Sequence, residues 1–347
     1  MIISRTPFRI SFFGGGTDYP AWYREHGGAV IGTTINKYCY ISFRKLPPFF
    51  EHRHRIVYSR IELPSSVEEI QHPAVRHVLA EHKVDEGVEV QHHGDLPARS
   101  GMGSSSSFTV GLLNALRAHR GQICSPHWLA NEAIRIEQEV IGEKVGSQDQ
   151  ICAAYGGTNL IHFNTDGTFQ VSPLIMSADR REELRSHLML FFTRFSRIAE
   201  TIAAKKIANL ANRTRQLRCM RQIVDEAAAI IQHPHRPIVE IGGLLRESWR
   251  LKKELADEVS NSSIDSICEA AESAGALGGK LLGAGGGGFM LIFAEPHCHN
   301  RIRESLNDLI EVSFQIGSPG SQIVVYEPNG FETETSSAPR AVAISRS

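Results

Sequence analysis

The chain has 347 residues, of which 41% are hydrophobic and 22% charged, and its 37 Lys and Arg nearly balance its 38 Asp and Glu. This is ordinary globular composition, and the formal net charge of -1 argues against a whole-protein field that would attract nucleic acid or a membrane surface. No run of about 18 apolar residues is present, so no membrane span is expected, and the length suggests two domains or one large one.

The N-terminus and the cysteines bear on the cellular compartment. The opening sequence MIISRTPFRISFFGGG contains neither the apolar stretch nor the small-residue cleavage site of a signal peptide. The six cysteines are scattered and form no CxxC pair, which is typical of reduced, mostly buried thiols. We therefore expect a cytoplasmic protein.

The first third of the chain predicts strands and then a helix. Residues 10–13, 29–35 and 38–44 are β-branched and aromatic and are bounded by glycine, which indicates strands. Another strand pattern at 87–96 leads through a glycine–serine segment into residues 108–119, which are apolar at helical spacing.

The middle of the chain continues this alternation. Ser125 and Pro126 suit an N-cap and a first helical turn, so they predict the start of a helix that runs to about Ile141. Strands are expected at 156–163 and 187–193, because both are short apolar runs.

The last part of the chain is mainly helical in pattern. Helices are expected over 197–232, from Pro237 towards Glu258, and over 262–274. A charged segment without strand character lies near residue 180, so we predict two domains, 1–182 and 183–347.

The strongest local signal is a glycine–serine segment between a strand and an apolar helix. Gly101 and Gly103 let the backbone approach a ligand, and Ser104, Ser105, Ser106 and Ser107 follow them directly before the apolar helical pattern. A helix N-terminus presents unpaired N–H groups and a positive dipole end, so this segment could bind phosphate, and its hydroxyls could reach a metal ion. The alternative is a flexible turn with a serine N-cap.

A second glycine run, 283–288, contains the pattern G-x-G-x-x-G. A dinucleotide-binding loop should follow a strand and open a helix, whereas here a helical segment is expected before the run and a strand after it. We therefore expect either a plain turn or a mobile loop that closes over a substrate, with Gly285 and Gly286 as candidate substrate contacts.

The third segment lies near the N-terminus and contains Gly14, Gly15, Gly16, Thr17 and Asp18. An aspartate just beyond a glycine bend can accept hydrogen bonds from sugar hydroxyls, and it can equally cap the following turn.

Taken in chain order, these three segments resemble the three motifs of the GHMP kinase superfamily. The middle motif, P-x-x-x-G-[LM]-G-S-S, is the most specific, and it stands at Pro97 to Ser105. Within the superfamily the chain looks most like the bacterial D-glycero-D-manno-heptose 7-phosphate kinases, through segments such as TPFRISFFGGGTDYP, HPAVR and VGSQDQICAAYGG. The resemblance implies an α/β fold of the α+β type, with an S5-like N-terminal domain and a ferredoxin-like C-terminal domain.

The resemblance also implies roles for particular residues. Arg9 would lie beside the transferred phosphoryl group, and Asp149 would be the catalytic aspartate. Ser105 and Glu137 would be ligands of Mg²⁺, with Glu139 as a nearby competitor for the second position. Pro97 and the residues of the following loop would hold ATP: Gly101, Gly103, Ser104, Ser105, Ser106 and Ser107.

One departure concerns the acceptor. Galactokinases have Gly-Glu-His-Thr-Asp where this chain has Gly14-Gly15-Gly16-Thr17-Asp18. The missing Glu and His leave room for a larger, phosphate-bearing sugar, and glycine N–H groups suit an oxyanion.

Several basic residues have open roles. Arg194 and Arg197 could bind a sugar phosphate, or Arg194 could alter specificity, and Arg99 could touch phosphate or lie at the surface. The basic stretch 205–221 lacks the aromatic residues expected of a nucleic-acid site, so a solvated helix face or the subunit interface of a homodimer is expected. None of the histidines has the spacing of a zinc finger or of HExxH.

Together, these features predict an ATP- and Mg²⁺-dependent sugar-1-kinase acting on D-glycero-D-manno-heptose 7-phosphate. The product would be the 1,7-bisphosphate, on the way to nucleotide-heptose for surface polysaccharide. The alternatives are a kinase of another sugar, such as fucose, mannose or a galactose relative, and a non-catalytic sugar sensor.

Overall fold

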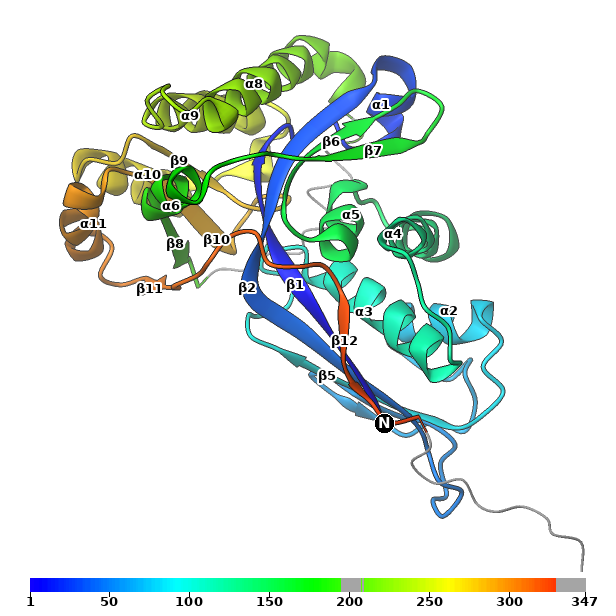
Figure 1. Ribbon diagram of the computed structural model, residues 1–347. Coiled ribbons are helices and arrows are strands. Elements are labelled where there is room, and N and C mark those ends of the chain that lie inside the picture. Colours follow the sequence, from blue (N-terminus) through cyan, green and yellow to red (C-terminus); the bar gives the residue numbers. More distant parts are fainter. Residues whose placement is uncertain (195–206, 208, 329–347) are drawn as a thin grey trace, which may run out of the picture.

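Two β-sheets with helices packed on them form the molecule in the computed structural model, which describes residues 1–194, 207 and 209–328 (Figure 1). The first sheet has eight strands, with the path β12-β1-β2-β5-β3-β4 and with β6 and β7 attached through β2. Its strands are β1 (Ile2–Phe13), β2 (Gly28–Lys45), β3 (Arg55–Val57), β4 (Ile61–Glu62), β5 (Val88–Gly94), β6 (Thr158–Phe163), β7 (Phe169–Pro173) and β12 (Gln322–Tyr326).

The second sheet has four strands in the order β11-β8-β10-β9. All of its pairings are antiparallel. Its strands are β8 (Leu188–Phe192), β9 (Gly278–Leu281), β10 (Phe289–Phe293) and β11 (Ile310–Glu311).

The long strand β2 organises the first sheet. Its first part pairs with β6 and its second part with β5, while β1 runs antiparallel along both. The strands predicted at 10–13, 29–35 and 38–44 are confirmed, and the last two are one continuous strand. The β1–β2 register shifts between Pro7 and Arg9, where a proline is tolerated because a bulge needs fewer ladder hydrogen bonds.

Helices of the N-terminal half cover one face of this sheet, and α3 packs directly on β1 and β2 (Figure 1). The predicted N-cap at Ser125 is confirmed, because its hydroxyl accepts a hydrogen bond from the Trp128 N–H at 3.1 Å. The helix continues as a π-helical segment, Ile136–Ile141. The helices are α1 (Pro20–His26), α2 (Pro73–Glu81), α3 (Ser104–His119), α4 (Pro126–Arg135) and α5 (Gln148–Tyr155).

The second half of the chain supplies the remaining helices. The helix predicted over 197–232 is confirmed for α8, which ends just before His233-Pro234, while 197–206 lie outside the described residues. The helices are α6 (Ala178–Ser186), α8 (Thr214–Gln232), α9 (Glu240–Lys253), α10 (Ser262–Ser273) and α11 (His299–Ser305), with 3₁₀ segments at Leu210–Arg213, Asp257–Val259 and Pro296–Cys298.

One prediction is wrong. The segment before the glycine run 283–288 is not helical but forms strand β9, which makes a hairpin with β10. The physical reason is the close packing of Gly278, where a Cβ would lie 2.1 Å from the Gly242 carbonyl oxygen of α9. Two adjacent glycines also disfavour a helix, and here they let the strand lie directly on α9.

The chain returns to the first sheet at its C-terminal end. Ile316 bridges Ile35, and β12 pairs with β1, as the orange segment beside β1 shows (Figure 1). The division at residues 182 and 183 stays a prediction, and the pairing shows that the C-terminal strand belongs to the first sheet.

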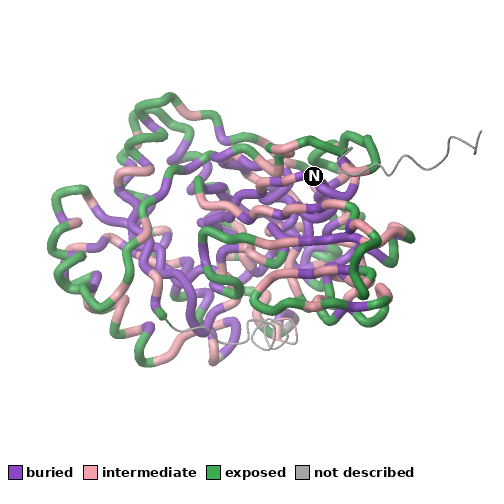
Figure 2. Tube along the Cα trace, turned by 90° about the horizontal axis from the view of Figure 1, so that it is seen from below, coloured by how far each residue is buried: buried purple, intermediate pink, exposed green. Residues whose placement is uncertain are grey.

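Buried residues concentrate along the central strands of both sheets (Figure 2). A large apolar cluster joins the first sheet to its helices, and a smaller one lies between the second sheet, α10 and α11. The mixed α/β class is confirmed. Over the described ranges, no helix is long and apolar enough to cross a bilayer.

Candidate active site

A buried ion pair joins β1 to α5. Arg9 Nε donates to Asp149 Oδ1 and Arg9 Nη2 donates to Asp149 Oδ2, both at 2.7 Å, so the pair is bidentate. The Arg9 side chain is 4% exposed, whereas that of Asp149 is 25% exposed, and a ligand can therefore reach the carboxylate. Burial alone would lower the pKa of Arg9, but attraction and hydrogen bonds from Asp149 raise it overall, which keeps the guanidinium charged.

The glycine–serine loop lies directly beside this pair. Arg9 Nη1 donates to the Gly101 carbonyl oxygen at 2.6 Å, and the Arg9 backbone N–H donates to the Met102 carbonyl at 3.1 Å. A Cβ at Gly103 would lie 3.2 Å from Arg9 Cγ and 3.4 Å from an Asp149 carboxylate oxygen. The loop, the arginine and the aspartate, which the sequence placed far apart, therefore form one site.

The loop conformation depends on positive φ angles. Gly101 has φ +81° and Gly103, at the start of α3, has φ +73°, a region where other residues are strained. The Ser100 hydroxyl donates to the Pro97 carbonyl at 2.7 Å, and the Arg99 N–H donates to the Ser104 hydroxyl at 3.0 Å. The N-terminus of the 16-residue helix α3, with its first N–H groups, therefore lies beside Arg9 and Asp149.

The second glycine run packs against this loop, backbone to backbone. A Cβ at Gly101 would lie 2.7 Å from the Leu282 carbonyl oxygen, and one at Gly283 would lie 2.4 Å from the Gly101 Cα. At the other end of the run, a Cβ at Gly288 would lie 2.2 Å from the Ser100 carbonyl oxygen. The two runs can approach this closely only because these positions lack side chains.

The middle of the same run has a different neighbour. Gly286 N–H donates to the Val259 carbonyl at 3.1 Å, and a Cβ at Gly285 would lie 2.7 Å from the Val259 Cα. The structure therefore places the two predicted substrate contacts, Gly285 and Gly286, against the 3₁₀ segment after α9.

Glu137 is fully buried beside the loop. The Ser106 hydroxyl donates to Glu137 Oε2 at 2.9 Å, and Gln150 Nε2 donates to the same oxygen. The other oxygen, Oε1, has no hydrogen-bond partner among the described residues. Burial, with added repulsion from Glu143, raises the pKa of Glu137 to about 7, although favourable interactions with Thr109, Ser106 and Gln150 oppose this shift.

This carboxylate fits the expected Mg²⁺ ligand. An orphaned, buried carboxylate oxygen next to a phosphate-binding loop suits a hard cation that keeps water and phosphate oxygens as its remaining ligands. The competing Glu139 is exposed. Ser105 is exposed as well, so the serine whose hydroxyl touches Glu137 is Ser106. No cluster of three or more acidic, histidine or cysteine side chains that could hold a metal alone occurs in the described part of the chain.

The N-terminal glycine segment forms a bend near Asp149. Gly16 N–H donates to Asp18 Oδ1 at 2.8 Å, so Asp18 caps this turn. Asp18 is 2% exposed. Burial raises its pKa, and repulsion from Asp149 adds to the increase. Gln148, the residue before Asp149, contacts both β1 and the bend. Its Oε1 accepts from the Ser11 hydroxyl at 2.7 Å, and its Nε2 lies near Gly15.

Helix α8 covers this bend. A Cβ at Gly16 would lie 3.2 Å from Leu217 of α8 and 3.3 Å from Leu255, which follows α9. Gly14 is equally tight, since its Cβ would lie 2.0 Å from the Ala29 carbonyl oxygen. The acceptor segment is therefore enclosed by parts of both halves of the chain.

The structure describes two of the three arginines singled out from the sequence. Arg99 and Arg194 are exposed and have φ angles of 58° and 59°. Arg197 lies outside the described residues, as does the start of the basic stretch 205–221.

An aromatic cluster beside the loop was not predicted. The His72 ring stacks on Phe108 of α3 with centroids 4.4 Å apart, and Tyr58 meets His72 edge-on at 4.8 Å. His92 approaches Phe108 at 5.4 Å. Burial lowers the pKa of His72 to about 4, so its ring is neutral at pH 7. The sequence signal that could have indicated this cluster is His72-Pro73, in which His72 is the N-cap of α2 and Pro73 its first residue.

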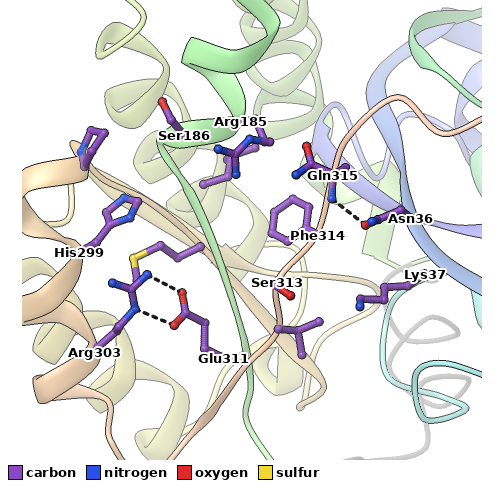
Figure 3. A pocket seen from close by; sticks show the side chains of 14 residues that line it. Asn36, Lys37, Arg185, Ser186, His299, Arg303, Glu311, Ser313, Phe314 and Gln315 are labelled. Carbon is purple, nitrogen blue, oxygen red and sulfur yellow. Dashed lines mark hydrogen bonds and ion pairs between the residues drawn. The ribbon is translucent and has the colours of Figure 1, made fainter.

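A polar hollow of about 460 Å³ lies elsewhere, where β2, β8, α11 and the segment before β12 meet (Figure 3). Two interactions lie within its lining: Arg303 Nε lies 2.8 Å from Glu311 Oε2, and Asn36 Oδ1 accepts from the Gln315 N–H at 2.7 Å. None of the residues around Arg9 and Asp149 lines it. The site is therefore not the open hollow but the tightly packed junction of the three glycine segments.

Comparisons with known proteins identify the family of the chain. Residues 68–157 match the model of the GHMP kinases N-terminal domain, and residues 227–311 match that of the GHMP kinases C-terminal domain. The D-glycero-alpha-D-manno-heptose 7-phosphate kinase of Campylobacter jejuni is 28% identical over 310 residues, 85% of this chain and 90% of that enzyme. A bifunctional fucokinase/GDP-fucose pyrophosphorylase of Arabidopsis thaliana is also 28% identical, over 89% of this chain but 31% of the longer plant protein.

A solved structure supports the fold. The crystal structure of a D-glycero-D-manno-heptose 1-phosphate kinase from Bacteroides thetaiotaomicron superposes with a TM-score of 0.75, covering 92% of this chain and 98% of that chain at 22% identity.

Proposed function

The chain belongs to the GHMP kinases, as an ATP-dependent carbohydrate kinase, and we propose that its acceptor is D-glycero-D-manno-heptose 7-phosphate. The γ-phosphoryl group of ATP would pass to the anomeric hydroxyl and give the 1,7-bisphosphate. The 28% identity to a heptose 7-phosphate kinase over most of both chains supports this acceptor.

The observation that carries the proposal is the Arg9–Asp149 pair at the mouth of the loop that begins α3. Phosphoryl transfer depends mainly on positioning and on neutralising charge. Arg9 provides a cation fixed by three hydrogen bonds, one of them to the loop itself. The α3 N-terminus provides N–H donors for phosphate oxygens.

Asp149 would position the acceptor hydroxyl and take up its proton. Each carboxylate oxygen accepts one hydrogen bond from Arg9 and keeps a further lone pair, so a hydroxyl can bind beside the arginine. The bidentate contact with Arg9 fixes the orientation of the carboxylate, so an acceptor hydroxyl bound to it would be held in a defined position. An anomeric hydroxyl is more acidic than an ordinary alcohol, which lightens the task of the base.

Glu137 and a loop serine would hold Mg²⁺, which would supply Lewis-acid neutralisation of the phosphate oxygens. The resemblance assigns the serine as Ser105, whereas Ser106 is the one that contacts Glu137. Gln150 and Ser106 keep Oε2 in place and leave Oε1 directed away from their hydrogen bonds.

The acceptor segment supports a large, polar sugar. Gly15 and Gly16 replace the Glu and His of galactokinases, so those two side chains are absent from the bend, and the side chains of Leu217 and Leu255 pack on Gly16 instead. We propose that Gly14, Gly15, Gly16, Thr17 and Asp18 contact the sugar, with Gly285 and Gly286 on the side of the second glycine run. Asp18 is held by Gly16, so its role would be to shape the bend and present backbone N–H groups.

Fucose is the second candidate acceptor, because a fucokinase is similarly identical to the chain. A panel of sugars with ATP and Mg²⁺, monitored by ADP release, separates the candidates. We expect the highest kcat/KM with the heptose 7-phosphate. Preference for fucose, mannose or galactose would replace the proposed acceptor, and no turnover on any sugar would favour a sugar sensor.

A further inference from the structure

Two buried lysines connect the second sheet to the two sides of the site. Lys252 lies near the end of α9 and is 6% exposed, and Lys280 lies on β9 and is 3% exposed. Burying an ammonium group costs several kcal/mol unless its donors are satisfied. Both lysines donate to backbone carbonyls of segments that border the site.

Lys252 holds the strand end that supports the phosphate-binding loop. Its Nζ lies 2.7 Å from the Leu281 carbonyl oxygen and 2.7 Å from that of Gly283. The carbonyl between these two, that of Leu282, is the one that would lie 2.7 Å from a Cβ at Gly101. The lysine therefore binds one side of the segment 281–283, and the loop rests on the other.

The contacts continue from this segment to the reaction centre. The Gly101 carbonyl accepts from Arg9, and Arg9 binds Asp149. A shift of 281–283 would move Gly101 because the two backbones are in van der Waals contact without side chains. Lys252 thus acts on the nucleotide side through the loop backbone.

Lys280 acts on the other side. Its Nζ donates to the Phe12 carbonyl oxygen of β1 at 2.9 Å. Phe12 is two residues before Gly14, where the acceptor bend begins, and three residues after Arg9. The ammonium therefore ties β9 to the end of the strand that leads into the acceptor segment.

We propose that Lys252 and Lys280 are positioning residues through which the second sheet sets the nucleotide side and the acceptor side of the site separately. The part of the proposal that concerns Lys280 rests on the sugar acceptor proposed above. Neither lysine touches the reacting groups. Each acts through a carbonyl: Lys252 on the phosphate-binding loop, and Lys280 on the acceptor bend.

The test is a pair of single variants in the full chain. Displacing a binding element by about 1 Å can cost 100-fold, so we expect Lys252→Met to raise the KM for ATP by about 10- to 100-fold with little change in the KM for the sugar. Lys280→Met should raise the KM for the sugar by about 10- to 100-fold with little change in the KM for ATP. Lys253→Met is the matched control, because Lys253 is the next residue, is exposed, and pairs with Asp265.

Direct titration with a non-hydrolysable ATP analogue keeps this test independent of the acceptor. Lys252→Met should bind the analogue at least tenfold more weakly, and Lys280→Met should bind it like the wild type. If the wild-type protein binds the analogue but phosphorylates no heptose phosphate, the proposed substrate fails while the analogue result still decides the role of Lys252.

Two further variants probe the same contacts from other positions. Gly283→Ala pushes on the same segment from the side of the loop and should give the same selective loss of nucleotide affinity, while Lys280→Gln keeps a donor at the second position. Equal changes in both KM values, or a lower melting temperature with unchanged affinities, would overturn the proposal and leave the lysines as purely structural groups.

Discussion

The reaction centre and the polar hollow both contain a bidentate arginine–carboxylate pair, yet they differ in every other respect. The Arg9–Asp149 pair is buried under glycine backbone, and beside it Glu137 keeps an oxygen without a partner. The Arg303–Glu311 pair lies at an open surface, with side chains 45% and 33% exposed (Figure 3). The difference shows that an ion pair or an empty space does not define a site.

The reaction centre differs from the hollow in containing groups whose burial is unfavourable for folding. A phosphate group is bound by closely approaching backbone N–H groups and by fixed charges, and it does not require an open hollow.

 The buried carboxyl of Glu137 opposes folding locally, because burial disfavours its charged form, whereas Gly101 and Gly103 adopt their positive φ angles without strain. Buried ionisable groups of this kind are concentrated where they serve a ligand, and the Arg303–Glu311 pair, by contrast, is partly exposed.

The largest expected effect is on turnover. Asp149→Asn should lower kcat by about 100- to 10,000-fold, because a positioned acid–base group is lost, while binding of an ATP analogue is retained. A coupled ADP assay and an analogue titration measure the two quantities.

The matched variant in the hollow is Glu311→Gln, which also removes one charge from an arginine pair. It should leave turnover unchanged. Near-normal turnover of Asp149→Asn, or a comparable loss in Glu311→Gln, would contradict the distinction between the two regions.

A smaller effect is expected on Mg²⁺ dependence. Ser106→Ala removes the hydroxyl that donates to Glu137 Oε2, and loss of a group that orients a metal ligand typically costs about 10- to 100-fold in metal affinity. The Mg²⁺ concentration for half-maximal activity at saturating ATP measures this change.

Ser105→Ala is the natural comparison, since it removes the adjacent hydroxyl. If Ser105 is a ligand, its removal should weaken Mg²⁺ binding at least as much as Ser106→Ala. An unchanged Mg²⁺ requirement in Ser105→Ala would remove the role that the family resemblance assigns to it.

The smallest effect concerns stability and pH. The folded-state pKa of His72 is lowered to about 4, so between pH 6.5 and 4 the unfolded chain binds a proton at this position that the folded chain does not. The free energy of unfolding should therefore fall as the pH is lowered through this range. His72→Gln should reduce that fall by about 1 kcal/mol for each pH unit within this range, as measured by denaturant unfolding at several pH values.

His299, in the hollow, provides the comparison. Burial lowers its pKa as well, although it is less enclosed than His72. His299→Gln should flatten the pH dependence less than His72→Gln does. A larger change in His299→Gln would show that the hollow, and not the reaction centre, carries the greater desolvation.

Much of the fold was available from local patterns. Alternating β-branched residues predicted β1, β2 and β5, and Ser125-Pro126 predicted the start of α4, because strand periodicity and caps depend on neighbours in the sequence. The strand β9 was missed, since its two glycines have no side chains and so carry no periodic signal. The pairing of β12 with β1 was equally invisible, because it joins residues more than 300 positions apart.

By itself, the sequence determined the three glycine segments, and their resemblance to the GHMP kinases pointed to Arg9, Glu137 and Asp149. The glycine segments can be found in this way because close approach of backbone to a phosphate requires small residues at short, fixed spacings. Only the tertiary structure decided that Ser106 touches Glu137, that Gly283 lies on Gly101, and that Lys252 and Lys280 support the two sides of the site. These contacts depend on how two sheets pack against each other, which no local pattern records.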